Sequence, residues 1–132
     1  MVGADTSFLS DLIRGDPKAA RYLERLDRKT ERLTTTALNM AELHHGAAGS
    51  VRRAAMLTEI AGLANQFVIL PVDAEVAVLY GELDYHLSRQ GRPLPFMDLL
   101  ISAILLRHGE SRVVTGNPKH FRSVPGLTVD EY

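Results

Sequence analysis

The chain of 132 residues, 45% of them hydrophobic, is long enough for one domain with an ordinary core and too short for two. Its formal net charge of −1 excludes a global basic field, so any binding to nucleic acid must use a local patch. The absence of cysteine excludes disulfides, thiolate nucleophiles and cysteine-based zinc sites, and favours the cytosol.

The N-terminal end predicts neither a signal peptide nor a membrane segment. An acidic residue already stands at position 5, and no apolar run approaches the ~18 residues needed to span a bilayer. We therefore expect a cytoplasmic protein with no membrane contact.

The first elements read as a strand followed by two helices. Residues 1–4 are short and apolar, which predicts a strand that ends at Asp5, and apolar residues then recur at helical spacing until a glycine. Asp16 followed by Pro17 is typical of an N-cap and a first helical residue, so a second helix should run to about Asp27.

Basic residues recur three or four positions apart along this second helix and would form one face: Arg21, Arg25, Arg28 and Arg32. Acidic residues stand between them and can pair with them locally. A solvated surface is therefore the alternative to a binding face.

The next unit reads as a strand and a helix. Residues 33–36 are rich in β-branched side chains, which predicts a strand. Asn39 and Glu42 have the spacing of a capping box, with Asn39 as the N-cap, and the helix should continue to Gly46 or Gly49.

A longer helix, a strand and another helix follow. Ser50 is placed to cap a helix over 51–65, and residues 67–72 are continuously apolar, which favours a strand buried on both faces. Asp73 should cap a helix that runs to about Gln90.

The C-terminal third contains the most apolar helix of the chain. A rigid connector at 91–95 leads into it, and residues 99–106 are apolar on nearly every face, which predicts burial on more than one side. Residues 112–115 then predict a strand, 116–118 a turn and 127–129 a fifth strand at an edge of the sheet.

The repeated alternation of strands and helices predicts an α/β fold. Crossover connections of this kind give a mostly parallel sheet of four or five strands flanked by helices. No repeat, low-complexity segment or linker divides the chain, so residues 1–132 should form a single domain.

Four polar residues follow strand ends or open helices, and all should face one edge of this sheet: Asp5, Glu42, Asp98 and Asn117. Taken singly, each has a local role as a cap or turn former. Taken together, three like charges repel by roughly 1 kcal/mol per close pair in water and by more where buried, so a cation is needed. Oxygen ligands without cysteine suit a hard ion, Mg²⁺ or Mn²⁺.

Four ordered motifs resemble those of the PIN-domain nucleases and, more narrowly, of the VapC-type toxins of prokaryotic toxin–antitoxin modules: Asp5-Thr6-Ser7, Ala41-Glu42-Leu43, Asp98 to Ala103, and Val114 to Phe121. The resemblance covers essentially the whole chain. It implies a PIN-like fold, Mg²⁺ or Mn²⁺ at the acidic cluster, endoribonuclease activity, a cognate antitoxin that inhibits it, and a homodimer.

Residue by residue, the resemblance assigns Asp5, Glu42 and Asp98 to the acidic metal-site positions. Asn117 falls at the fourth position, where the family uses Asp or Asn; an amide adds no charge, which argues against a second ion. Gly116 stands where the family's toxins often carry arginine, so one phosphate contact is missing.

The leading hypothesis is hydrolysis of an RNA phosphodiester by a water that the metal ion activates. Ser7 and Thr115 are candidates to position that water or a phosphate oxygen. Four arginines are candidates for contacts to the RNA backbone: Arg21, Arg25, Arg52 and Arg53. His120, beside Phe121, is expected to have a packing role.

Two other functions fit parts of the sequence. Asp5 after an N-terminal strand is also the position of a phosphatase nucleophile of the haloacid dehalogenase kind, but that family's second aspartate is Ser7 here. A PIN-like domain that binds RNA or protein without cleaving it is the non-enzymatic alternative, and the three carboxylates argue against it.

Overall fold

A parallel sheet of five strands forms the centre of the molecule, in the order β3-β2-β1-β4-β5. The computed structural model describes all residues from 1 to 132. The strands are β1 (Val2–Ala4), β2 (Leu33–Thr36), β3 (Val68–Leu70), β4 (Arg112–Val114) and β5 (Thr128–Asp130). The predicted α/β class and the mostly parallel sheet are confirmed.

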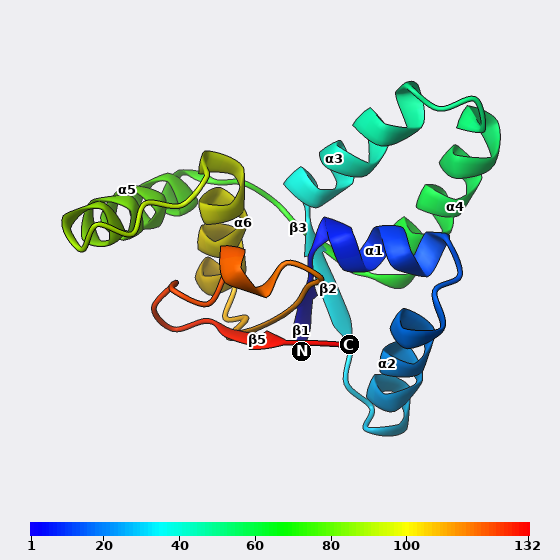
Figure 1. Cartoon of the computed structure of the whole chain (residues 1–132), viewed down its shortest axis with the longest axis horizontal. Coiled ribbons are helices and arrows are strands. Elements are labelled where there is room, and N and C mark those ends of the chain that lie inside the picture. Colours follow the sequence, from blue (N-terminus) through cyan, green and yellow to red (C-terminus); the bar gives the residue numbers. More distant parts are fainter.

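Six α-helices cover the two faces of the sheet: α1 (Thr6–Ile13), α2 (Pro17–Arg28), α3 (Ala37–Ala48), α4 (Arg53–Gln66), α5 (Ala74–Arg89) and α6 (Phe96–Arg107). A short 3-10 turn, η1 (Pro118–His120), follows β4. Helices α1 to α4 lie on one side of the sheet and α5 and α6 on the other, so each face has its own hydrophobic cluster (Figure 1). None of the helices combines the length and the apolar character needed to cross a bilayer.

Helix α6 is buried on most of its surface, as its sequence predicts. Five of its apolar side chains are at most 1% exposed: Leu99, Ile101, Ala103, Ile104 and Leu105. It packs closely on β1 because Gly3 has no side chain; a Cβ at that position would lie 2.5 Å from Leu105 Cδ2. The last turn of α6 is thereby held close to the central strand of the sheet, and Asp98 lies in the first turn of the same helix.

Helix α3 begins three residues earlier than its sequence suggests. The N-cap is Thr36, the last residue of β2; its hydroxyl accepts from the Asn39 amide, and Asn39 Oδ1 accepts from the Thr36 amide. The prediction of Asn39 as N-cap and Glu42 as its capping-box partner was wrong. Since strand and helix are joined without a loop, Thr36 ends one and caps the other, and Glu42 lies in the second turn.

Two further expectations from local patterns were wrong. Strand β3 is an edge strand, with Val68 49% and Ile69 38% exposed, because a run of apolar residues does not reveal whether a strand has a neighbour on each side. Ser50 does not cap α4; its hydroxyl accepts from the Arg52 amide in the preceding turn, and the helix begins at Arg53.

Candidate active site

Asp5 lies at the carboxyl end of β1, where parallel strands and the following helices share one edge of the sheet. The side chain is 6% exposed and makes no cap hydrogen bond to α1, so both of its oxygens are available to other elements. Oδ1 accepts from Asn39 Nδ2 at 3.2 Å, and Oδ2 accepts from Thr115 Oγ1 at 2.8 Å and Ser7 Oγ at 3.1 Å. Three elements therefore fix this carboxylate.

Asn39 links Asp5 to Glu42. Its side chain is fully buried, and Nδ2 also donates to Thr6 Oγ1 at 2.9 Å; Thr6 in turn donates to Glu42 Oε1 at 3.1 Å. Sequence reasoning gave Asn39 only a capping role. The side chain of Asn39 therefore belongs both to the capping box of α3 and to the acidic cluster. Its contact with the cluster was not predicted from the sequence.

Asp98, in the first turn of α6, has a histidine partner. His120 Nδ1, from η1, lies 3.0 Å from Asp98 Oδ2. Only a packing role was predicted for His120. Its contact with Asp98 was not predicted, because nothing in the local sequence shows which carboxylate η1 faces. The fourth motif therefore reaches the acidic cluster through His120 as well as through Thr115.

The negative charges of Asp5, Glu42 and Asp98 repel one another. Burial raises the pKa of Glu42, and the charges of Asp5 and Asp98 raise it further, although the hydrogen bond from Thr6 opposes them. Burial also raises the pKa of Asp98, and Asp5 adds to this, while His120 opposes it. Keeping this cluster ionised is unfavourable without a cation.

The chemistry of the donor set fits a hard divalent ion. All ligand candidates are oxygens, and no cysteine is present. As the side chains stand, no three acidic or histidine groups are close enough together to ligate one ion, since Asp98 faces His120 and Glu42 faces Thr6. This arrangement suits an ion that takes few direct carboxylate bonds and keeps much of its water, as Mg²⁺ does.

Ser7, Thr115 and Asn117 lie around Asp5 but have different contacts. The two hydroxyls are 3.2 Å apart and both contact Asp5, while Ser7 Oγ accepts from the Gly116 amide at 2.9 Å. Asn117 is exposed; its amide donates to Thr115 Oγ1 at 3.0 Å, and its side chain makes no hydrogen bond to the three carboxylates. The two hydroxyls orient Asp5 and tie the turn after β4 to α1.

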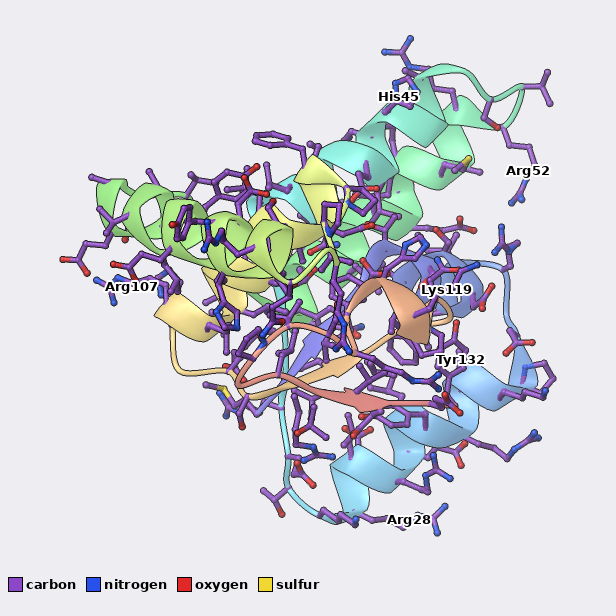
Figure 2. All side chains as sticks on the ribbon, turned by 60° about the vertical axis from the view of Figure 1, so that its left-hand side comes forward. Arg28, His45, Arg52, Arg107, Lys119 and Tyr132 are labelled. Atoms are coloured by element: carbon purple, nitrogen blue, oxygen red, sulfur yellow. The ribbon has the colours of Figure 1, made fainter.

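The four arginines proposed to contact RNA do not lie together. Arg21 and Arg25 are exposed on α2, and the guanidinium of Arg25 stacks 5.4 Å from the centre of the Tyr22 ring. Arg52 pairs with Glu59 at 3.7 Å, and Figure 2 shows it at the outer end of the hairpin formed by α3 and α4, well away from Lys119 of η1. Arg53 begins α4 at the same end of the hairpin.

Comparison with known proteins agrees with this geometry. A family model described as "PIN domain" matches residues 4–127. The tRNA(fMet)-specific endonuclease VapC of Salmonella typhimurium is 28% identical over 131 residues, which cover 97% of this chain and 95% of that protein.

Solved structures agree over the same length. The VapBC-1 structure from nontypeable Haemophilus influenzae matches with a TM-score of 0.85 and 27% identity, covering 99% of this chain and 98% of that one. VapBC2 from Rickettsia felis, bound to a DNA fragment from its promoter, matches in fold with a TM-score of 0.89 and 23% identity, covering 100% and 99%. The chain belongs to the PIN-domain family of nucleases, and within that family it is similar to VapC proteins over nearly its whole length.

Proposed function

We propose that residues 1–132 form a single metal-dependent endoribonuclease domain, the toxin of a toxin–antitoxin module. The observation that carries this proposal is the hydrogen-bonded cluster of buried Asp5 and Asn39 with half-buried Thr6 and Glu42, with Asp98 within electrostatic range. The VapC relative from Salmonella is named as a tRNA(fMet)-specific endonuclease, which supports RNA, and tRNA first, as the substrate to test.

Asp5, Glu42 and Asp98 would hold Mg²⁺ or Mn²⁺, and Asn117 would contact it through water. Such an ion, when bound, neutralises phosphate charge and lowers the pKa of an attacking water. The chain's own contribution is orientation. Ser7, Thr115 and Asn39 fix both oxygens of Asp5, and no side chain needs to act as a nucleophile.

A cognate antitoxin and a homodimer complete the proposal. The solved structures that match this chain include VapBC complexes, which supports an antitoxin partner. A nuclease of this kind needs a restraint in the cell, and a segment that covers the acidic cluster would provide it.

The decisive experiment is cleavage of a purified tRNA pool by antitoxin-free protein in Mg²⁺ or Mn²⁺. We expect discrete products that disappear in EDTA and in Asp98→Asn, which keeps the shape of the side chain and removes its charge. Glu82→Gln removes an exposed carboxylate on α5 and is the matched control, with activity unchanged. Cleavage that survives in EDTA, or in Asp98→Asn at the wild-type rate, would refute the proposal.

Metal binding should stabilise the fold, and the effect should depend on pH. An ion at about 100 times its Kd contributes roughly 2.7 kcal/mol, which raises Tm. The pKa values of Glu42 and Asp98 are raised in the folded protein, so the metal-free protein gains stability as pH falls through those values. When the ion is present, the same protons compete with it for the carboxylates. We expect the metal-induced rise in Tm to be large at pH 7.5 and to shrink at pH 5.

Differential scanning fluorimetry with and without Mn²⁺ at the two pH values would measure this. Glu42→Gln should reduce the rise at pH 7.5, and Glu82→Gln should not. A rise in Tm of equal size at both pH values would show that the ion binds elsewhere.

A further inference from the structure

Two adjoining hollows run between α2 and the C-terminal residues 130–132. The first, of about 450 Å³, is lined by Lys18, Thr115, Gly116 and Tyr132 among others. The second, of about 480 Å³, is lined by Tyr22, Arg25, Lys29 and Arg112 among others, and both include Glu131. Figure 1 shows the C-terminus beside α2. We call these two hollows together the α2 trough.

The wall of the trough on the side of α2 is a single stripe of that helix and its C-cap residue, Lys29. Lys18, Tyr22, Arg25 and Lys29 recur at intervals of four, three and four residues, which places them on one face over about 16 Å. Hydrogen bonds hold the C-terminal wall in place: Tyr22 of α2 donates to Asp130 at 2.7 Å, and Tyr132 donates to Asp11 of α1. The trough is therefore a built feature and not a gap between mobile parts.

Most acidic groups along the trough have a cationic partner. Asp11 pairs with Arg14, Asp130 with Arg112 (which Glu31 shares) and Glu131 with Arg122, whereas Asp16 accepts only from the Ala19 amide. By contrast, Lys18, Arg25 and Lys29 have no carboxylate within ion-pairing distance. These three cations outnumber Asp16, the one carboxylate of the lining without a cationic partner, so the charge left over along the trough is positive.

One residue of the trough lining is in direct contact with the acidic cluster. Thr115 and Gly116 line the first hollow, and Thr115 Oγ1 donates to Asp5 at 2.8 Å. A chain lying in the trough would therefore arrive beside Asp5. Arg52 and Arg53, at the outer end of the α3–α4 hairpin, are not part of this path.

We propose that the α2 trough binds the single-stranded RNA next to the scissile phosphate, with Lys18, Arg25 and Lys29 contacting successive backbone phosphates. This rests on the proposed function, which places cleavage at Asp5. An acidic protein segment is the other occupant that the charge would attract. RNA is favoured because Thr115, in the lining of the first hollow, hydrogen-bonds Asp5 of the cluster where the phosphodiester must be placed.

The test is RNA binding by wild-type protein and by Lys18→Gln/Arg25→Gln/Lys29→Gln, with a labelled single-stranded 12-nucleotide RNA of mixed sequence in EDTA. Losing three phosphate contacts should lower the slope of log K against log salt concentration by about 2, since each contact to a single strand contributes about 0.7. The matched control is Arg89→Gln/Arg92→Gln/Arg107→Gln. It removes three exposed charges from α5 and α6 and from the turn between them, and Figure 2 shows Arg107 on the opposite side from Tyr132.

We expect an unchanged slope in the control, and a thermal melt should show that both variants are folded. An unchanged slope in the trough variant, an equal change in both variants, or no salt-dependent binding by wild-type protein would overturn the proposal. A trough variant that binds and cleaves RNA normally but escapes the antitoxin would assign the trough to a protein segment instead. If wild-type protein fails to cleave while the trough variant still loses binding, the proposed function fails and only RNA binding in the trough stands.

Discussion

Asp5→Asn should reduce RNA cleavage by more than about 100-fold while leaving the fold intact. Partners outside a metal's own ligand shell already contribute about 10- to 100-fold to activity or affinity, so a carboxylate that holds the ion should contribute more. The amide fits the same contacts: its oxygen can accept from Asn39, and its nitrogen can donate to the hydroxyls of Ser7 and Thr115. Those hydroxyls are 3.2 Å apart and can turn toward each other.

Two measurements separate chemistry from folding in this variant. Single-turnover cleavage in Mn²⁺ should fall below detection, whereas the free energy of unfolding without metal should stay within about 1 kcal/mol of wild type, because hydrogen bonds are kept and a like charge is removed. A variant that unfolds would show that Asp5 is chiefly structural. A folded variant with full activity would remove Asp5 from the site.

The arrangement of strands and helices could be predicted because its determinants are local. Asp16 and Pro17 begin α2 as expected, with the Asp16 side chain accepting from the Ala19 amide, and the apolar face of 99–106 marks α6 as the buried helix. The N-cap of α3 was predicted wrongly because β2 and α3 meet at Thr36 without a loop. The burial of β3 was predicted wrongly because it depends on whether the strand has a neighbour on each side.

The contacts of the candidate site could not be predicted, because they join residues far apart in sequence. The sequence placed Asp5, Glu42 and Asp98 at one edge of a parallel sheet, since that follows from topology alone. The partners of these carboxylates depend on how helices pack; Asn39 is 34 positions from Asp5, and Thr115 is 110. His120, in contact with Asp98, was assigned only to packing for the same reason.

Asn39→Asp should destabilise the metal-free fold at pH 8 by about 3 kcal/mol or more, the usual cost of a buried charge without a partner. The side chain is fully buried, and its Nδ2 lies 3.2 Å from Asp5 Oδ1, so the substitution sets two carboxylate oxygens against each other. One proton shared between them would restore a hydrogen bond, so the pair should titrate with a raised pKa. Stability is then lost as pH rises through that value and regained as pH falls.

Urea unfolding at pH 8 and pH 5 would measure the difference, with Asn65→Asp as the control, because Asn65 is exposed on α4 and the same change there should have little effect at either pH. An equal loss at both pH values would show that the amide serves α3 rather than the carboxylate. A loss confined to high pH would show that the neutral donor at position 39 spares the carboxylate of Asp5 a like charge in the interior. Asn39 would then be as necessary to the acidic cluster as the carboxylates themselves, because a fourth acidic group in its place cannot donate a hydrogen bond to Asp5 unless it is protonated.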